Sequence, residues 1–237
     1  FFAVAMLEEA SELREAGITH PILILGYTSP SQYREMLAYD VRPCIYDYKT
    51  AEALGKTALE AGCTARPHIA VDTGMNRIGF QVTEEDADQI AAINALPGIE
   101  IEGLFTHLSC ADMTEKTHAC GQFHKYAEMV SMLEKRGVQI PVRHICNSAG
   151  TMEFDGNRYE MVRAGIVMYG LYPSEEVDKS RLDLIPALSW KTHVIHVKEI
   201  GPGEGVSYGA TYGTEKEKTR VATISIGYAD GYPRALS

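Results

Sequence analysis

Short apolar runs and amphipathic stretches alternate along most of the chain. The runs are nearly continuous and rich in Val, Ile, Leu and aromatic residues, which is the pattern of strands buried on both faces. They are Phe1–Ala5, Pro21–Gly26, Arg42–Asp47, His68–Asp72, Ile99–His107, Val142–Asn147 and Val162–Gly170. Strands that alternate with helices predict βαβ units around a parallel sheet.

Helix signals lie between these runs. Thr50 is a suitable N-cap for a helix over Ala51–Ala61 that ends at Gly62. Thr83 is expected to cap Glu84–Leu96, whose acidic first turn suits the helix dipole. The segment before Gly137 is predicted to be a third helix. Its buried face is expected at residues that recur at helical spacing, namely Cys120, Phe123, Ala127, Val130 and Leu133.

The number of units favours a barrel. The runs make about seven βα units in roughly 180 residues, whereas a (β/α)8 barrel needs eight units and about 250 residues. The chain opens inside a strand, at Phe1, without an initiator Met. We therefore expect an α/β fold in which residues 1–183 form a TIM-type (β/α)8 barrel that lacks its first strand. A doubly wound open sheet is the alternative, but the Gly-rich fingerprint usual after its first strand is not seen.

The pattern changes after about residue 183. Leu188–Ile200 alternates like an antiparallel strand, and Gly201-Pro202-Gly203 predicts a turn. Val206–Tyr212 and Arg220–Tyr228 are further strand candidates. These are too few strands to bury a core of their own. Residues 184–237 are thus predicted to be the start of a C-terminal β domain.

Composition narrows the class of protein. The chain has 45% hydrophobic residues and a net charge of -10, which indicates a globular protein and argues against nucleic acid and anionic membranes as partners. Five cysteines without C-x-x-C spacing favour a reduced, cytoplasmic location. We find no apolar run of about 18 residues and no signal-peptide pattern.

Candidate chemistry lies where the strands end, because barrel enzymes place their active sites there. Those ends are Asp72–Arg77, Thr106-His107, Cys146–Ala149 and Arg163–Ile166. The loops after the last two strands form the usual phosphate site of such barrels. Ser148 offers a hydroxyl group there, and Gly165 allows close approach of the backbone to an anion.

Six segments, in this order, resemble the alanine racemase family of pyridoxal-phosphate barrels with a C-terminal β domain. They are Val71-Asp72-Thr73-Gly74-Met75-Asn76-Arg77-Ile78-Gly79, Thr106-His107-Leu108, His144-Ile145-Cys146-Asn147-Ser148-Ala149, Met161-Val162-Arg163-Ala164-Gly165-Ile166, Val206-Ser207-Tyr208-Gly209 and Ile226-Gly227-Tyr228-Ala229-Asp230-Gly231-Tyr232. Each motif is weak alone, and their common order carries the resemblance.

The resemblance implies pyridoxal 5'-phosphate as cofactor and two-base proton exchange at the Cα of the amino acid. Arg163 would face the pyridine nitrogen and keep it unprotonated, because arginine is a permanent cation. Tyr208 would be one base, donated by the partner subunit of a homodimer. His107 would hydrogen-bond between Arg163 and Tyr208, with His144 behind Arg163. Such a network is needed for a tyrosine to accept a proton near neutrality.

The resemblance also implies the remaining contacts. Arg77 would bind the phenolic oxygen of the cofactor and the substrate carboxylate. Ser148, Gly165 and Ile166 would hold the phosphate. The other implied residues are Asn147 beside the phosphate, Leu25 near the cofactor ring, and Tyr228, Asp112 and Arg234 at the entrance. Tyr228, which would also contact substrate, and Arg234 would come from the partner.

Two departures from the family pattern stand out. The Schiff-base lysine of the family, in a Lys-Ala-x-Ala-Tyr-Gly-type motif, is not found in these residues, so this chain alone is expected to be inactive. Many members also carry a carbamylated lysine two residues before the Asp-Thr-Gly, where this chain has Ala70. Either another group or a bound anion would then hold Arg77.

The resemblance thus implies an alanine racemase that supplies D-alanine for peptidoglycan. A serine racemase of the same family and a non-catalytic pyridoxal-phosphate carrier stay as alternatives. A metal-dependent barrel hydrolase is a third alternative, suggested by the run Cys110, Asp112, His118, Cys120 and His124. His118 and His124 are six residues apart and fall on different faces of a helix, so no metal site is predicted.

Overall fold

The computed structural model describes residues 1–156, 159–233 and 235. They form two compact units, Phe1–Ala187 and Leu188–Ser237. Within those described ranges, no helix combines the length and the apolar character that crossing a membrane demands. The boundary expected at 183/184 stays a prediction.

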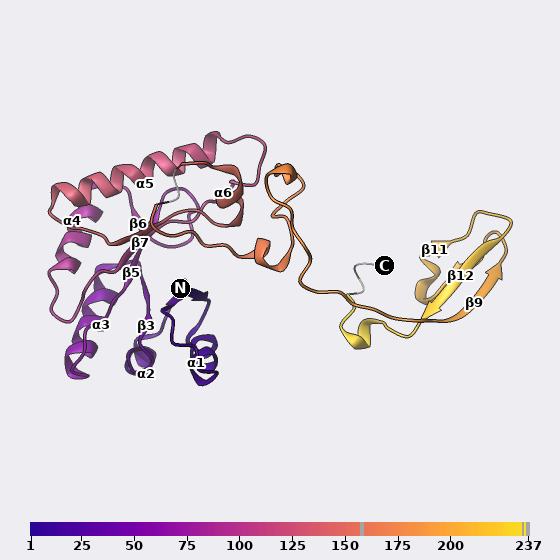
Figure 1. Cartoon of the computed structure of the whole chain (residues 1–237), viewed down its shortest axis with the longest axis horizontal. Coiled ribbons are helices and arrows are strands. Elements are labelled where there is room, and N and C mark those ends of the chain that lie inside the picture. Colours follow the sequence, from indigo (N-terminus) through magenta and orange to yellow (C-terminus); the bar gives the residue numbers. More distant parts are fainter. Residues whose placement is uncertain (157–158, 234, 236–237) are drawn as a thin grey trace. The chain divides into compact units, whose positions relative to one another are not determined.

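Parallel strands in chain order form the centre of the first unit (Figure 1). The first three are β1 (Phe2–Val4), β2 (Ile22–Ile24) and β3 (Val41–Arg42). These three form one sheet. A second sheet follows in the order β4 (Cys44–Ile45), β5 (His68–Asp72), β7 (Gly103–Phe105) and β8 (Val142–His144), with β6 (Phe80–Gln81) paired to β5. Only Pro43 separates β3 from β4. It lacks an N–H group, but its carbonyl accepts a hydrogen bond of 2.9 Å from the His68 N–H.

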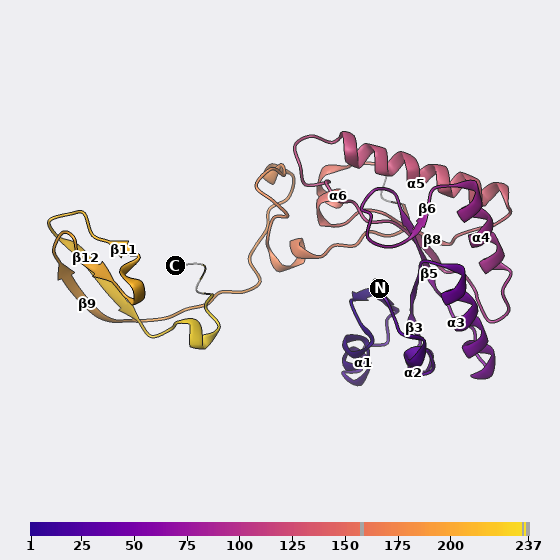
Figure 2. The same cartoon turned by 180° about the vertical axis from the view of Figure 1, so that it is seen from behind.

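Helices follow the strands along the chain and cover the outer side of the sheet (Figure 2). They are α1 (Leu7–Glu15), α2 (Tyr33–Ala38), α3 (Tyr48–Glu60), α4 (Glu84–Asn94), α5 (Thr117–Lys135) and α6 (Ser148–Glu153). The short 3-10 helices of this unit are η1 (Pro30–Gln32), η2 (Ile166–Tyr169) and η3 (Lys179–Arg181).

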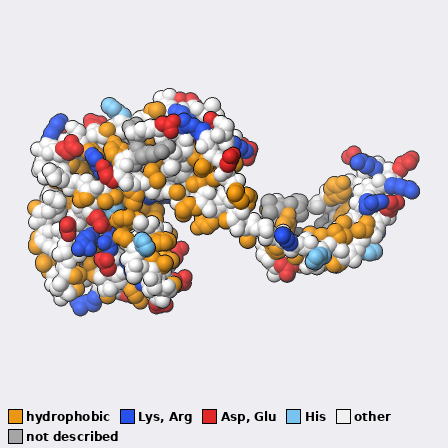
Figure 3. Space-filling view, viewed as in Figure 1, with side chains coloured by type: hydrophobic (Ala, Val, Ile, Leu, Met, Phe, Trp, Pro, Cys, Tyr) orange, Lys and Arg blue, Asp and Glu red, His pale blue; other side chains and the backbone are white. Residues whose placement is uncertain are grey.

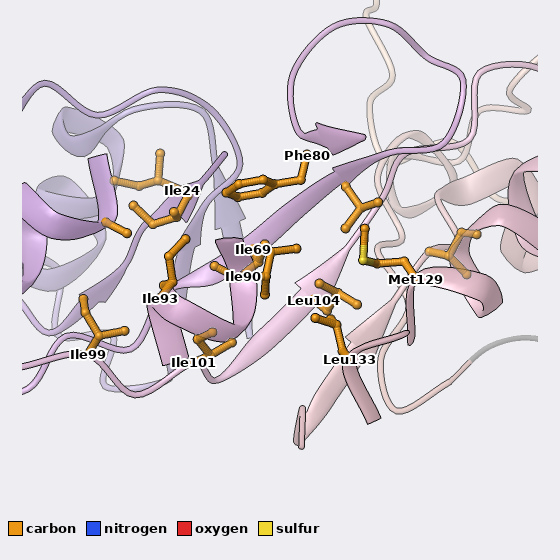
Figure 4. Packing of buried hydrophobic residues seen from close by; sticks show 14 of the residues in the cluster. Ile24, Ile69, Phe80, Ile90, Ile93, Ile99, Ile101, Leu104, Met129 and Leu133 are labelled. Carbon is orange, nitrogen blue, oxygen red and sulfur yellow. The ribbon is translucent and has the colours of Figure 1, made fainter. Parts of the chain in front are cut away.

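The core lies between the strands and the helices (Figure 4). Ile69 on β5 and Leu104 on β7 are fully buried, as are Ile90 and Ile93 on α4. Leu133 on α5 is also buried against this cluster. The apolar faces predicted for strands and helices therefore meet in one interior, with the carboxyl ends of the strands left at one edge.

The predicted cap of α4 is confirmed and that of α3 is wrong. The Thr83 hydroxyl accepts a hydrogen bond of 3.1 Å from the Asp86 N–H. In α3 the cap is Asp47, whose carboxylate accepts from the Thr50 N–H at 2.7 Å. Either residue type makes a good N-cap, so spacing alone did not separate Asp47 from Thr50.

The buried face of α5 also differs from its prediction. Phe123 and Leu133 are buried, but Cys120 and Ala127 are exposed. The face is instead formed by Ala119, Gln122, Phe123, Tyr126, Met129, Met132 and Leu133. Two polar side chains belong to it because each finds partners inside. Tyr126 donates to the Leu104 carbonyl at 2.6 Å, and Gln122 donates to the His107 carbonyl at 2.9 Å.

The predicted strand over Val162–Gly170 is wrong for most of its length. Its start runs beside the segment that follows β8, where the Arg163 N–H donates to the Cys146 carbonyl at 2.8 Å. The chain then turns into η2, which ends at Gly170 with φ 78°. The apolar residues Met168 and Tyr169 of η2 are exposed, so this run is not buried in a sheet.

The second unit is built on an antiparallel pair of β9 (Val194–Ile200) and β12 (Thr219–Ile224). A smaller pair joins β10 (Gly205–Val206) to β11 (Tyr212–Gly213), with η4 (Tyr208–Ala210) between them and η5 (Tyr228–Asp230) after β12. The single strand expected over Val206–Tyr212 is therefore wrong. Charged side chains gather at one end of this unit (Figure 3).

Candidate active site

The carboxyl ends of the strands surround a cavity of about 870 Å³. Eight of the predicted site residues line it: Leu25, His107, Asp112, Asn147, Ser148, Arg163, Gly165 and Ile166. A second cavity, of about 1080 Å³, shares Leu25 and His107 with the first and is also lined by Arg77. The loops after separate strands thus bring Arg77, His107, Ser148 and Arg163 around adjoining hollows.

Groups at the ends of β7 and β8 accept hydrogen bonds from Arg163. Its Nη1 donates to Nδ1 of His144 at 2.6 Å and to the His144 carbonyl at 3.1 Å. Its Nη2 donates to the carbonyls of Thr106, at 2.6 Å, and Ile145, at 3.1 Å. The Nε–H group is buried and has no hydrogen-bond partner among the described residues. The Nε–H group of the guanidinium is therefore left without an acceptor among the described residues.

The charge of Arg163 survives its burial. Desolvation lowers the pKa of Arg163 to about 10, so the side chain is still a cation at neutral pH. Its hydrogen-bond partners among the described residues are Nδ1 of His144 and the carbonyl groups of His144, Thr106 and Ile145, and none of them is a carboxylate. The Phe105 ring lies 5.4 Å from its central carbon, a distance at which a cation is attracted to an aromatic face.

His107 is a neutral imidazole in this setting. Burial, together with the positive charges of Arg163 and Arg77, lowers the pKa of His107 to about 4. Its Nε2 lies 3.4 Å from Nδ2 of Asn147. The hydrogen bond expected between His107 and Arg163 is not present, because Arg163 directs its donors to His144 and to backbone carbonyls.

Ser148 and Gly165 form the part of the cavity expected to bind phosphate. Asn147, not Ser148, caps α6, since its side-chain oxygen accepts from the Gly150 N–H at 3.0 Å. Ser148 is the first residue of α6, and its Oγ accepts from the Gly165 N–H at 2.9 Å. A Cβ atom added at Gly165 would meet only this Oγ, at 3.7 Å. Gly165 therefore leaves open space beside a hydroxyl group.

The loop that carries Arg77 is shaped by Asp72. Oδ1 of Asp72 accepts hydrogen bonds from the N–H groups of Gly74, at 2.9 Å, and Asn76, at 3.0 Å. Gly74 and Asn76 both have positive φ, 137° and 56°, which glycine and asparagine tolerate best. Arg77 itself is exposed and makes no hydrogen bond or ion pair with the described residues. Beside it, Ala70 borders a cavity of only about 10 Å³.

Gln122 is a buried residue of the site that sequence reasoning missed. Its Nε2 donates to the His107 carbonyl at 2.9 Å and to Thr73 Oγ1 at 3.2 Å. Its Oε1 accepts from the Ser109 N–H at 3.0 Å. Gln122 thus ties the loop after β7 to the loop after β5. The available signal was a polar residue at a helical position between apolar ones.

The remaining predicted residues fall outside this cavity. His144 is fully buried behind Arg163. Tyr208, in η4, and Tyr228, in η5, belong to the second unit and are largely exposed. Arg234 lies outside the described residues. Among the residues that are described, no three His, Cys, Asp or Glu side chains are grouped so as to hold a metal ion.

Comparison with known proteins decides the family. Residues 1–173 match the model of the alanine racemase N-terminal domain, and residues 187–237 match that of the C-terminal domain. The chain belongs to the alanine racemase family. It is 48% identical to the alanine racemase of Clostridium perfringens strain SM101 over 235 residues, which are 99% of this chain and 61% of that protein.

Two solved structures extend this likeness to three dimensions. The alanine racemase of Clostridium difficile 630 is 42% identical, with a TM-score of 0.88 over 98% of this chain and 60% of that one. The alanine racemase of Bacillus anthracis with bound L-Ala-P is 38% identical, with a TM-score of 0.82 over 97% of this chain and 59% of that one. The prediction of a TIM-type barrel followed by a β domain is therefore confirmed.

The chain spans about 60% of the length of the alanine racemases that it matches. Both domains of the family are represented in it, the first over most of the chain and the second over 187–237. The candidate residues of the cavity all lie in the part that matches the N-terminal domain.

Proposed function

We propose that the whole protein interconverts L- and D-alanine with the help of pyridoxal 5'-phosphate bound in the 870 Å³ cavity. The observation that carries the proposal is that Arg163 lines this cavity while its buried Nε–H group has no hydrogen-bond partner among the described residues. A buried donor left unpaired costs about 1–3 kcal/mol. A ligand that offers an acceptor to this donor would recover that energy.

The pyridine nitrogen of the cofactor is such an acceptor. Arginine cannot give up its proton in this range, so it can only donate, and a ring nitrogen that accepts from it stays unprotonated. When bound, pyridoxal phosphate supplies an electron sink for the charge that develops at the substrate Cα. An unprotonated ring weakens that sink, which favours return of the proton over transamination.

The other end of the cavity fits a phosphate group. Ser148 accepts from the Gly165 N–H, so its own O–H group stays available as a donor. The first N–H groups of η2, starting at Ile166, have no partner inside the helix. The space beside Gly165 is open. Arg77 and Arg163 add positive charge at the two cavities. Leu25 and Asn147 also line the 870 Å³ cavity.

We assign the proton transfers to groups on either side of the substrate. Tyr208 of a partner subunit in a homodimer would move a proton at its phenolic oxygen on one face. His107 is neutral and can accept a hydrogen bond from that phenol. Arg77 would bind the substrate carboxylate, since no described residue occupies its guanidinium. Tyr228, Asp112 and Arg234 would border the entrance.

The second base of the family is a lysine in a motif that residues 1–237 do not contain. The test therefore uses a chimera that adds to this chain the parts of Clostridium perfringens alanine racemase that it does not span. We expect the chimera to bind pyridoxal phosphate, seen as visible absorbance, and to form D-alanine from L-alanine. Absence of cofactor binding would overturn the proposal. Binding without turnover would indicate a carrier, and faster turnover of serine would overturn the choice of alanine.

The role of Tyr208 has its own test in the same chimera. Tyr208→Phe should abolish racemisation, while one enantiomer of alanine still exchanges its Cα hydrogen with deuterium from the solvent. The cofactor absorbance should be retained. Tyr212→Phe, at another exposed tyrosine of the same unit, is the matched control and should behave as the parent. Loss of exchange for both enantiomers would contradict the assignment of Tyr208.

A further inference from the structure

A buried row of polar side chains leads away from the cavity beneath Arg163. Nδ1 of His144 accepts from Arg163, and Nε2 of His144 lies 2.8 Å from Nδ1 of His68. Nε2 of His68 lies 3.5 Å from the Oε2 atom of Glu102, which is within ion-pair distance, although this nitrogen has no partner with full hydrogen-bond geometry among the described residues. Glu102 in turn accepts from Nε of Arg42 at 2.9 Å. The row starts at the end of β8, passes to the start of β5 and ends just before β7.

The direction of these hydrogen bonds follows from the chemistry of imidazole. The Arg163 guanidinium can only donate, so Nδ1 of His144 must carry a lone pair. A neutral imidazole has one N–H group, which for His144 must then be on Nε2. That group donates to Nδ1 of His68. The N–H of His68 is therefore on Nε2, facing the carboxylate of Glu102.

The reverse arrangement is excluded. If His68 donated from Nδ1, both nitrogens of His144 would have to accept, and His144 would be an imidazolate anion. The reverse arrangement would also leave a lone pair on Nε2 of His68 directed at the negative charge of Glu102. Both His68 and His144 are fully buried, so neither could exchange its bonds for water without a cost of about 1–3 kcal/mol.

Electrostatic interactions and ring packing favour one protonation state for His68, His144 and Glu102. Burial lowers the pKa of His68 and of His144, and the positive charge of Arg163 lowers both further. Burial raises the pKa of Glu102, but its bonds with His68 and Arg42 outweigh this, and the net shift is downward. The two histidines are thus neutral and Glu102 is ionised. Phe105 stacks on His144 with ring centroids 5.1 Å apart.

The order of the row has a consequence for Arg163. A carboxylate bound directly to the guanidinium would offset its charge. Here the carboxylate of Glu102 is held two imidazole rings away, and Arg163 is bound by a neutral nitrogen and by backbone carbonyls. The guanidinium is therefore oriented without losing its positive field at the cavity.

We propose that His68 and Glu102 are positioning residues, which hold His144 as the Nε2–H form and thereby aim the Nε–H group of Arg163 at the ligand. This inference rests on the proposed function only for its effect on catalysis. The hydrogen-bond directions are properties of the chain alone. Failure of either part can therefore be recognised separately.

The first experiment observes the hydrogen bonds without cofactor. The 237-residue chain is labelled with nitrogen-15 in its histidines, and the ring nitrogens are observed by NMR at pH 7. Protonated and unprotonated ring nitrogens have well-separated resonances, so the form of each histidine can be assigned. We expect neutral Nε2–H forms for His68 and His144. A protonated Nδ1 on His144, or an imidazolium at either position, would overturn the proposal.

The second experiment removes the acceptor that His144 needs. His68→Asn places a side-chain oxygen near the present position of Nδ1, whereas His68→Leu removes the acceptor. In the chain, His68→Leu should disturb the ring resonances of His144, and His68→Asn should largely restore them. In the chimera, His68→Leu should lower kcat by roughly 10- to 100-fold, by analogy with the loss of a group that orients a metal-binding histidine, with a smaller effect on KM.

Glu102 is tested by Glu102→Gln and Glu102→Ala. The amide can still accept from His68 and Arg42, so Glu102→Gln should keep the Nε2–H forms. Glu102→Ala should allow the other form to appear. Thermal unfolding of each variant shows whether it is folded. A folded Glu102→Ala or His68→Leu variant with unchanged His144 resonances would overturn the positioning role, whether or not the chimera racemises alanine.

Discussion

Gln122 on α5 and Thr73 after β5 are joined by a hydrogen bond of 3.2 Å from Nε2 to Oγ1. Thr73 Oγ1 in turn lies 2.8 Å from Thr106 Oγ1. These three side chains are buried, so the loops after β5 and β7 are joined by a small polar cluster inside the protein. Their bonds cannot be replaced by water without rearrangement of the loops.

Gln122→Leu should lower the free energy of unfolding by about 1–3 kcal/mol, because it leaves buried hydrogen-bonding groups unpaired. Urea denaturation with a fluorescence readout would measure this. His124→Leu, at an exposed position of the same helix, is the control and should change stability by less than about 0.5 kcal/mol. Equal effects of the two substitutions would show that the Gln122 bonds contribute nothing.

Stability should fall as the pH falls below about 6.5. The folded pKa values of His68, His107 and His144 are lowered, whereas unfolded histidine titrates near pH 6.5. The unfolded chain therefore binds more protons in this range, and acid favours it. Each histidine should contribute a slope of about 1.4 kcal/mol per pH unit.

Unfolding by urea at several pH values between about 4 and 7 would give this slope. For His107 the loss of stability should extend down to pH about 4, its folded pKa. His107→Asn should reduce the slope by about 1.4 kcal/mol per pH unit, which corresponds to one proton. The exposed control His124→Gln should leave the slope unchanged. A slope that His107→Asn does not alter would mean that His107 titrates normally in the folded protein.

Gly103→Ala should disrupt the row beneath Arg163. A Cβ atom at Gly103 would overlap the ring of His68, which is buried and has no room to move. We expect a loss of about 1–3 kcal/mol in the free energy of unfolding, as for other overpacked cores. Calorimetry or urea denaturation would measure it, and the His144 ring resonances should change as well.

Gly121→Ala is the matched control for that substitution. Gly121 lies within α5, and a Cβ atom there would meet nothing within 4 Å. Alanine favours the helix, so Gly121→Ala should stabilise the chain by up to about 1 kcal/mol. If both alanine variants shifted stability in the same direction, the close approach of Gly103 to His68 would not be the cause.

Ser148→Ala should weaken binding of pyridoxal phosphate about 10-fold, the equivalent of one hydrogen bond of about 1.4 kcal/mol. Binding of pyridoxal, which lacks the phosphate, should be unchanged. Absorbance titration of the chimera measures both affinities. Ser31→Ala, at an exposed residue of η1, is the control. Equal weakening for both ligands would place Ser148 away from the phosphate.

The order of strands and the location of the candidate site could be predicted from sequence because both depend on local patterns. Strand β5 was predicted as His68–Asp72 and has those bounds. Thr83 was recognised because its cap and the acidic turn that follows are contiguous in sequence. The rule that barrels function at the carboxyl ends of their strands was enough to select the loops around Ser148 and Arg163.

What could not be predicted depends on partners that lie far apart in sequence. The face of α5 was misplaced because apolar spacing gives no sign that Gln122 would be buried with Thr73, 49 residues away. The row of His68 and Glu102 lies at the opposite ends of strands β5 and β7 from the site, where side chains are expected to serve stability. A histidine that opens a fully buried strand was the one signal available.

In the loop that carries Arg77, hydrogen bonds to Asp72 order the backbone but not the Arg77 side chain. The backbone is already fixed in the folded chain by two bonds to one carboxylate, so a ligand does not have to organise it. The Arg77 side chain has no such restraint. Capture of an anion there costs only rotamer freedom, at most about 2 kcal/mol, and the loop is in this sense preorganised for binding while its charged end remains adaptable.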